Sequence, residues 1–352
     1  MLVIKIPLKI ANKVQEFIRK DDLSVKDYDF YKDKENLYLA VNESKEILNK
    51  FPDVKTSKKE LTKRRRTPTT LKEALKDDIP KELLSNLKTA FDTVGDIAII
   101  EVDEELKKYE KIIATKLLEI NKQLKVVTKK EGIHGGTFRT QKLKVLAGEE
   151  RKETIYTENN CRLKLNVEEV YFSPRLSTER KRIMKLVKKG ENILVMFCGC
   201  APYPCVLAKN SEARHITGIE INPQGHKYGL ENIKLNKLTN VDLINADATK
   251  VMPLEENNKP IIFDRILMPL PKSAEDFLDA ALSNAGKNTI IHFYDFLHES
   301  EFHLAIEKIE KACKRNKLKH EVIGTYKCGN HAPRVFRICV DFKIKWKMFK
   351  KQ

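Results

Sequence analysis

The chain has 352 residues, of which 41% are hydrophobic and 33% are charged, a composition typical of a globular protein with two or three domains. It shows no apolar run near the ~18 residues of a membrane span and no signal peptide, so we expect a cytoplasmic protein without a membrane partner. Lys and Arg number 67 against 50 Asp and Glu, and the net charge of +17 favours a polyanionic partner such as RNA. A Lys- and Glu-rich surface is also typical of heat adaptation.

The seven cysteines are an odd number and lack the C-x-x-C pairs of zinc sites, so we expect reduced thiols and no metal. Three of them, Cys198, Cys200 and Cys205, lie close together in the sequence. Small packing residues are the simpler interpretation of such thiols.

Residues 1–60 are the first predicted domain, in which strands at 2–6 and 37–41 alternate with helices at 13–18 and 43–49. The basic stretch 58–66 follows. It is either an exposed linker or a hinge that grips phosphates, and the sequence favours the two about equally.

Residues 68–166 are the second predicted domain, of the α+β class. Its expected elements are helices at 71–75, 83–91 and 104–124, a strand at 97–102, a glycine-rich loop at 132–140, and a hairpin of strands 154–157 and 162–167.

The third predicted domain, 167–352, opens with a helix start signal. Ser173 is a candidate N-cap, and Pro174 follows it at the first helical position. Arg175 and Glu179 are then four residues apart, and a surface ion pair on one helix face is the plain structural interpretation of this spacing.

Strands and helices then alternate, which predicts an α/β fold with a doubly wound sheet. The strand that starts at residue 192 runs into Gly199 and Pro202, and the next two strands end in the acids Glu220 and Asp247. The later elements follow the order of a seven-stranded methyltransferase sheet: helix 274–282, strand 289–294, helix 301–315, and strands 321–326 and 336–342.

The loop after the first of these strands indicates the kind of cofactor. A dinucleotide site would need G-x-G-x-x-G, whereas Gly199 stands alone, so we do not expect a pyrophosphate. S-adenosyl-L-methionine has no phosphate and suits the same crevice, with Glu220 accepting the ribose hydroxyls. The segment 267–271 resembles the proline-containing motif that methyltransferases place beside the methyl group. A generic α/β crevice without this cofactor is the alternative.

Four motifs carry a resemblance to a known family: Gly95-Asp96-Ile97, Phe138-Arg139 followed by 146–149, the segment 171–175 with Glu179-Arg180, and 220–223. With them, residues 90–343 resemble the archaeal and eukaryotic tRNA (guanine-37-N1)-methyltransferases. The segment 171–175 with its trailing Glu-Arg is the specific part, and the N-terminal domain matches only by position and size.

The resemblance implies a class I S-adenosylmethionine-dependent methyltransferase with a Rossmann-like seven-stranded sheet and two smaller N-terminal domains. The small first domain would recognise the tRNA elbow, and the other two would hold the anticodon stem-loop and flip guanosine 37 into the site. We expect a monomer.

The resemblance also implies roles for individual residues. Glu179 would be the general base, Arg139 would steady guanine O6, and Arg175 and Tyr171 would shape the pocket. The residues carried over to the cofactor site, with Tyr171 at its border, are Arg180, Phe197, Gly199, Glu220, Ile221, Asp247, Ala248 and Pro269.

The chemistry independently favours these residue types. Guanine N1 carries a proton, so its methylation needs a base for that proton and a cation for the charge that grows on O6. A Glu and an Arg supply both. An unperturbed Glu, with a pKa of ~4.3, is a poor base for so weak an acid, so we expect the closed complex to desolvate Glu179.

Two positions depart from the family pattern. Val195 stands where the cofactor strand usually carries an acid, and Pro269 stands where an Asn usually opens the Asn-Leu-Pro motif. Two alternative functions stay open at this stage. One is a wybutosine-pathway enzyme that transfers the aminocarboxypropyl group of the same cofactor to the same tRNA position, and the other is a catalytically inactive tRNA-binding protein.

Overall fold

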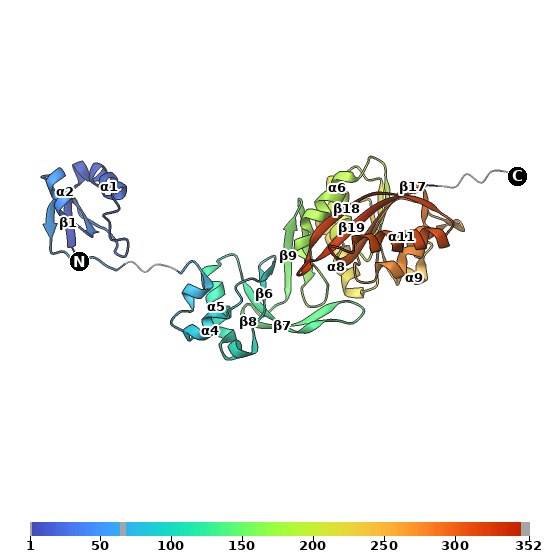
Figure 1. Ribbon diagram of the computed structural model, residues 1–352, viewed down its shortest axis with the longest axis horizontal. Helices are drawn as coiled ribbons and strands as arrows, with labels where there is room; N and C mark the ends of the chain where they lie inside the picture. The colour runs from blue at the N-terminus through green and yellow to red at the C-terminus, as the bar shows by residue number, and fades with distance from the viewer. Residues whose placement is uncertain (1, 64–67, 346–352) are drawn as a thin grey trace. The chain divides into compact units, whose positions relative to one another are not determined.

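The computed structural model describes residues 2–63 and 68–345 (Figure 1). Arg64, Arg65 and Arg66 of the predicted basic linker, and residues 346–352 of the tail, lie outside the described residues. The chain divides into two compact units, Met1–Ala74 and Leu75–Gln352. Across the described ranges, no helix has the length and apolar character to cross a membrane.

The first unit is a four-stranded sheet of order β2-β3-β1-β4 with two helices packed on it. Val14 and Ile18 of α1 and Ile47 of α2 contact Ile4 and Ile6 of β1. The predicted strands and helices are present, and the structure adds the short strands β2 and β4. The elements are β1 (Leu2–Pro7), α1 (Ala11–Lys20), β2 (Tyr31–Lys32), β3 (Asn36–Val41), α2 (Lys45–Lys50), β4 (Lys55–Ser57) and α3 (Leu71–Ala74).

The second unit begins with a four-stranded sheet of order β5-β6-β7-β8, against which α5 packs. The predicted glycine-rich loop is wrong in part, because Gly132 and Gly135 belong to a long hairpin strand and only 136–139 form the turn. The predicted helix 104–124 starts as a 3-10 helix, η2 (Glu104–Tyr109). The other elements are α4 (Lys81–Ser85), β5 (Asp92–Val94), β6 (Ile97–Ile100), α5 (Glu110–Ile120), β7 (Val126–Gly135) and β8 (Thr140–Gly148).

The Gly95-Asp96 motif ties this sheet to the hairpin that follows. Asp96 accepts hydrogen bonds from Arg151 Nη1 at 3.0 Å and from the Thr154 hydroxyl at 2.8 Å. Gly95 has a φ of +58°, and a Cβ there would lie 2.2 Å from Thr154 Oγ1. Glycine is therefore required at this turn, and the motif serves the architecture rather than the chemistry.

The predicted hairpin is present as β9 (Glu153–Glu158) and β10 (Cys161–Asn166). Leu163 packs with Val206 of the catalytic domain, and the backbone N–H groups of Arg162 and Lys164 donate to the side chains of Asn236 and Asn232. The hairpin therefore packs against α7 (Pro202–Asn210) and α8 (Pro223–Leu235).

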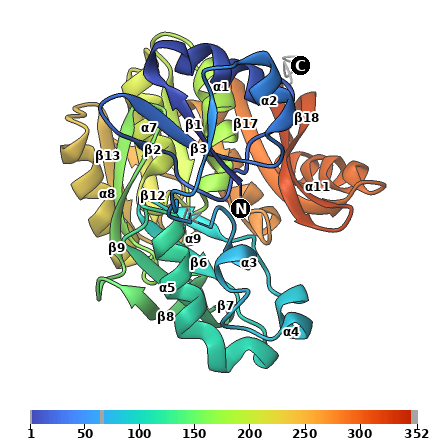
Figure 2. The same ribbon diagram turned by 90° about the vertical axis from the view of Figure 1, so that its left-hand side faces the viewer.

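The second unit also contains a seven-stranded sheet of order β13-β12-β11-β16-β17-β19-β18, in which β19 runs antiparallel to the other six strands. The expected α/β fold is thus present (Figures 1 and 2). Its strands are β11 (Asn192–Met196), β12 (His215–Glu220), β13 (Val241–Asn245), β16 (Phe263–Met268), β17 (Ala285–His298), β18 (Lys319–Ala332) and β19 (Val335–Lys345), with a separate ribbon of β14 (Glu255–Glu256) and β15 (Lys259–Pro260).

Helices cover both faces of this sheet. Successive side chains of a strand point to opposite faces, and the apolar side chains on each face need a helix layer to bury them. Leu194 and Met196 face α10 and α11, whereas Ile193 and Val195 face α6 and α7. The helices are α6 (Ser177–Leu186), α7 (Pro202–Asn210), α8 (Pro223–Leu235), α9 (Ala248–Val251), α10 (Leu278–Ser283) and α11 (Phe302–Arg315), with 3-10 helices η3 (Pro174–Leu176) and η4 (Ala274–Phe277).

Candidate active site

The strand order creates a crevice at the carboxyl edge of the sheet. β11 pairs with β12 on one side and with β16 on the other. The chain proceeds outward from β11 through β12 to β13 and then crosses back to β16, so the strand order reverses at β11. In open α/β sheets, ligands bind at such a switch point, outside the carboxyl ends of the strands. The loops after β11, β12, β13 and β16 therefore border the candidate site.

The loop after β11 has an uncommon backbone. Phe197, Gly199 and Ala201 all have positive φ angles, of 59°, 57° and 63°. Only the glycine adopts this region without strain, and strained residues of this kind cluster at ligand sites. The loop turns the Gly199 N–H toward β12, where it donates to Glu220 Oε2 at 2.6 Å.

Glu220 ends β12 and is almost completely buried. Burial raises the pKa of its carboxyl group, and the backbone N–H groups of Asn222 and Gly199 oppose the rise. Each oxygen accepts one of these N–H groups, and each can accept one further donor. A Cβ at Gly225 of α8 would lie 3.2 Å from Glu220 Cγ, so the helix approaches the carboxylate closely.

The other residues expected to bind the cofactor lie along the same edge. Asp247 caps α9 by accepting the Thr249 N–H at 2.9 Å, and hydrogen bonds from the Thr249 hydroxyl and N–H lower its pKa. Ala248 is buried behind this cap, while Ile221, beside Glu220, is 36% exposed. Because β12 and β13 pair in parallel, the ends that carry Glu220 and Asp247 lie at the same edge of the sheet.

Phe197 and Pro269 border the crevice on the β16 side. The Phe197 ring meets Phe277 edge to face, with 4.7 Å between the ring centroids. Pro269 directly follows β16 in a tight turn, in which the Leu270 N–H donates to Met268 O at 2.7 Å. The proline-containing motif therefore lies next to the cofactor loop.

The position of Val195 in the core accounts for the absence of an acid there. Its side chain is fully buried in the core formed with α6 and α7 rather than in the crevice. An acid at this position would be a buried charge that needs a partner, and valine removes that cost.

Arg139 belongs to the middle domain and contacts the edge of the seven-stranded sheet that carries the crevice. It lies in the turn between β7 and β8, and its Nη2 reaches Ser273 Oγ at 3.4 Å, just after the proline motif. Burial lowers the pKa of its guanidinium; the nearby Tyr171 opposes this shift, and Arg337 adds to it. The turn between β7 and β8 therefore brings Arg139 next to the segment that follows the proline-containing motif.

Glu179 lies in the first turn of α6 and is 5% exposed. Arg182 donates from Nε and Nη2 to its two oxygens, both at 2.8 Å, and the Tyr294 hydroxyl donates to Oε1 at 2.7 Å. The carboxylate is therefore already desolvated in the free protein, whereas we expected this to require the closed complex.

The predicted surface ion pair of Arg175 with Glu179 is wrong. Arg175 lies in η3, before α6 begins, and its guanidinium pairs with Asp92 of β5, 2.7 Å from Nη2 to Oδ1. The 3-10 turn rotates Arg175 away from the α6 face that carries Glu179. With a 71% exposed side chain, Arg175 joins η3 to the middle domain and is not placed beside the base candidate.

Arg180, which is expected at the cofactor site, has a side chain that is only 1% exposed. Its Nε and Nη2 bind both oxygens of Glu158, and Nη2 also donates to Ser173 O at 3.2 Å. The guanidinium carbon lies 5.2 Å from the centre of the Phe172 ring. Arg180 therefore stabilises the loop 171–173 through its contacts with Phe172 and Ser173.

Sequence reasoning missed the polar network that supports Glu179. Arg182 also binds Asp341, which accepts His292 Nδ1 at 2.6 Å, and His292 Nε2 lies 2.7 Å from Arg265 Nη1. Arg265 in turn binds Glu191 through Nε and Nη2. These residues are up to 159 positions apart, so no local pattern could have indicated them.

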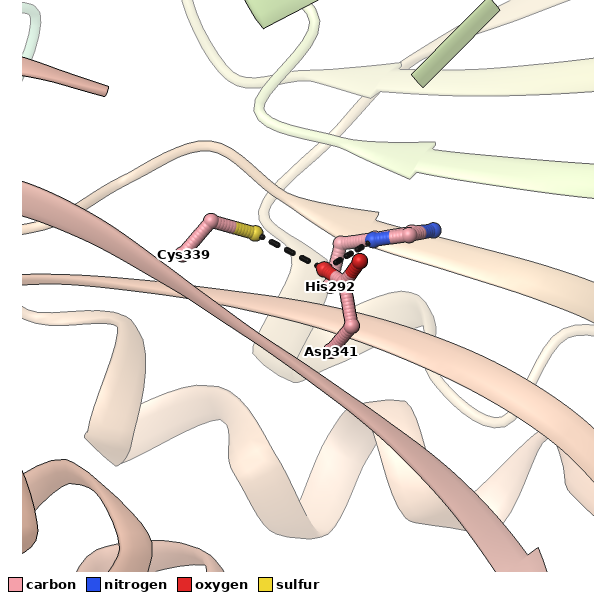
Figure 3. Close-up of side chains that lie close together, drawn as sticks. All are labelled: His292, Cys339 and Asp341. Atoms are coloured by element: carbon pink, nitrogen blue, oxygen red, sulfur yellow. Dashed lines mark hydrogen bonds and ion pairs between the residues drawn. The ribbon is translucent and has the colours of Figure 1, made fainter. Parts of the chain in front are cut away.

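Figure 3 shows His292 of β17 and Cys339 and Asp341 of β19 pointing toward one another. These residue types can bind a metal, but two guanidinium groups, of Arg182 and Arg265, contact the same cluster. Their charge disfavours a cation, so we interpret the cluster as a buried hydrogen-bond network. His292 Nε2 accepts from Arg265, so Nδ1 carries the proton that it donates to Asp341.

Two protein-family models match successive parts of the chain. The TRM5/TYW2 methyltransferase domain model matches residues 154–323, and the TYW2 N-terminal domain model matches residues 71–151. The tRNA (guanine(37)-N(1))-methyltransferase Trm5b of Pyrococcus abyssi is 38% identical over 97% of this chain and 99% of its own length.

Two further similarities bear on the site. The structure of the complex of aTrm5 and tRNALeu has a TM-score of 0.83 and 31% identity, covering 97% of this chain and 99% of that one. The tRNA(Phe) (4-demethylwyosine(37)-C(7)) aminocarboxypropyltransferase of Pyrococcus horikoshii is 29% identical over 78% of this chain and 96% of its own length. Because the Trm5b similarity extends over almost the entire chain, the chain belongs to the tRNA (guanine-37-N1)-methyltransferase family, within the wider TRM5/TYW2 group.

Proposed function

We propose that the protein transfers a methyl group from S-adenosyl-L-methionine to N1 of guanosine 37 in tRNA. The observation that carries this proposal is the position of Arg139, which the middle domain brings to Ser273 beside the cofactor crevice. A guanidinium group there can donate to guanine O6 while N1 faces the crevice. Family membership supports the cofactor and the tRNA substrate.

The crevice residues fit the cofactor by their donor and acceptor chemistry. The unfilled acceptor positions of Glu220 suit two ribose hydroxyls, and the exposed Ile221 offers an apolar surface to the base. Phe197, Asp247 and Ala248 complete the border. When bound, S-adenosyl-L-methionine supplies an electrophilic methyl group on a positively charged sulfur.

In the proposed reaction, N1 gains the methyl group and loses its proton, and Glu179 accepts that proton. Both Glu179 oxygens are bound by Arg182, and one of them also accepts from Tyr294, so the substrate must displace or share one of these donors. Arg139 stabilises the negative charge that develops on O6. Tyr171 shapes the pocket, while Arg180 positions its loop through Ser173 O.

The aminocarboxypropyl transferase stays the second candidate, because the match to residues 71–151 is to a TYW2 N-terminal domain. The aminocarboxypropyltransferase relative covers 78% of this chain, against 97% for Trm5b, which favours methyl transfer. We further propose that the anticodon stem-loop and the elbow of tRNA are the contacted parts, and that the protein acts as a monomer in the cytoplasm.

The proposed function is tested by incubating the protein with an unmodified tRNA transcript and S-adenosyl-L-methionine, followed by mass spectrometry of the nucleosides. We expect 1-methylguanosine from a transcript with guanosine at position 37 and none from a matched transcript with adenosine there. An aminocarboxypropyl adduct would favour the second candidate. Cofactor and tRNA binding without any product would indicate an inactive binding protein.

A further inference from the structure

Arg337 of β19 has a side-chain N–H group that residues 2–63 and 68–345 leave unpaired. Among the described side chains, its Nε is the buried nitrogen or oxygen atom without a hydrogen-bond partner. Its Nη2 donates to the Tyr171 hydroxyl at 3.1 Å. Leaving a buried N–H group unpaired is unfavourable, so such an atom indicates a missing partner.

Three other arginines of this domain show what the Nε and Nη2 edge of a guanidinium binds when it is filled. Arg180, Arg182 and Arg265 each present this edge to both oxygens of one carboxylate, from Glu158, Glu179 and Glu191 respectively. Arg337 presents the same edge, but a neutral hydroxyl occupies one half of it, and none of the described residues occupies the other half. No described carboxylate lies within ion-pair distance of Arg337.

The surroundings of Arg337 suit a nucleotide. The guanidinium carbon lies 5.1 Å from the centre of the Phe296 ring, its cross-strand neighbour. The His331 ring stacks on Phe296 with 4.0 Å between the centroids and 21° between the planes. Arginine edges bind phosphate oxygens in two-donor contacts, and exposed ring stacks accept unstacked bases.

Arg337 also lies beside the target pocket. It contacts Tyr171 directly, and its charge acts on Arg139, the residue that we assign to guanine O6. Two guanidinium groups that repel each other in a partly buried site are stabilised by an anion between or beside them. In the substrate RNA, the anions are the phosphodiester groups, and a flipped base brings its own flanking phosphates to this position.

We propose that the Nε and Nη2 edge of Arg337 binds a phosphodiester group that flanks the target guanosine, with the Phe296–His331 stack supporting the adjoining nucleotide. Arg337 is thus a substrate-binding residue that fixes how far the target base enters the pocket. The inference rests on the proposed function, since it takes tRNA as the substrate.

Neutral methylphosphonate linkages test this contact. They are introduced one at a time on either side of guanosine 37 in an anticodon stem-loop, whose binding to the full-length protein is then measured. We expect one linkage to weaken binding to the wild-type protein roughly 10- to 100-fold, and Arg337→Gln to bind the natural and the neutral linkage equally. Arg337→Lys keeps the charge without the two-donor edge and should lose most of the discrimination.

Arg334→Gln is the matched control, because it removes a cation from the same hairpin that is paired with Glu299 and lies outside the site. It should retain the wild-type sensitivity to the neutral linkage. Tyr171→Phe, which removes the hydroxyl from the other half of the edge, should retain it as well. If Arg337→Gln fails to fold, the wild-type comparison of linkages and Arg337→Lys still test the inference.

Three results would overturn the inference. One is a wild-type protein that binds every neutral linkage as tightly as the natural RNA. The second is an Arg337→Gln variant as sensitive as the wild type. The third is a variant that loses cofactor affinity in calorimetry while its RNA binding is unchanged, which would assign the edge to the cofactor carboxylate. Normal methylation of guanosine 37 by the wild-type protein alongside any of these leaves the proposed function standing.

Discussion

Glu179 and Arg182 face each other one turn apart on α6 and join two carboxylate oxygens to two guanidinium nitrogens at 2.8 Å. The same arginine binds Asp341 of β19, so the base candidate is fixed to the sheet through a single side chain. This arrangement surrounds the buried Glu179 carboxyl group with hydrogen-bond donors and orients its oxygens. If Glu179 serves only as a structural ion pair, its substitution should change stability more than methylation. If Glu179 is the general base, its substitution should change methylation.

Glu179→Gln separates these two roles. Gln keeps the shape and most of the hydrogen bonding but cannot accept the N1 proton, so we expect single-turnover methylation to fall roughly 10²–10⁴-fold with little change in tRNA or cofactor affinity. Tyr294→Phe is the control, because it removes one donor to Glu179 Oε1 and leaves the carboxylate in place. A Gln variant within a few-fold of the wild type across a pH series would remove Glu179 as the base.

Glu220→Gln tests the cofactor crevice. Gln replaces one acceptor oxygen by a donor, so it cannot accept the Gly199 and Asn222 N–H groups and two ribose hydroxyls together. We expect calorimetry to show roughly 10- to 100-fold weaker S-adenosyl-L-methionine binding and nearly unchanged tRNA affinity. Asp242→Asn, on the neighbouring strand β13 with a 78% exposed side chain, should change neither. Equal loss of both affinities would contradict the assignment.

Arg139 and Arg175 are a matched pair of arginines from the predicted catalytic set. Arg139→Lys loses the planar two-donor edge, and we expect turnover to drop roughly 10- to 100-fold at saturating tRNA. Arg175→Gln removes an exposed ion pair with Asp92, and the chemical step should stay within a few-fold of the wild type. The rate of single-turnover methylation measures both, and similar losses in the two variants would contradict the division of roles.

The buried His292 predicts a pH dependence of stability. Burial lowers its pKa below the ordinary value of 6.5, and Arg265 and Arg182 add to the shift while Asp341 opposes it. Below pH ~6.5 the unfolded chain therefore binds a proton that the folded protein excludes, so this contribution is complete above pH ~6.5 and declines as the pH falls.

Urea unfolding at several pH values between 5 and 8 measures this effect. We expect His292→Asn to flatten the dependence on pH by at most about 1.4 kcal/mol per pH unit, because one proton is linked to unfolding. The exposed His303 supplies the control, since His303→Asn should leave the slope of the wild type unchanged. Identical slopes in all three proteins would show that His292 titrates alike in the folded and unfolded states.

Strand-end acids were predictable because they depend on local patterns. Glu220 and Asp247 follow short apolar strands, and parallel strands bring their carboxyl ends to one edge of a sheet. The lone Gly199 and the hairpin turn at Asn159 and Asn160, with φ angles of 42° and 60°, were local signals of the same kind. The α/β fold and the cofactor crevice thus followed from the sequence.

Long-range pairing was decided only by the tertiary structure. The four-residue spacing predicts an ion pair of Arg175 with Glu179. Arg175 lies instead in the 3-10 helix η3, before α6 begins, and Arg182 is the arginine that binds Glu179. The partner of Arg180 is Glu158 of β9, 22 positions away. Tyr171 and Arg337 meet across 166 positions. Hydrogen-bond partners in a core are set by which elements pack together, and a charged residue's neighbours in sequence do not specify them.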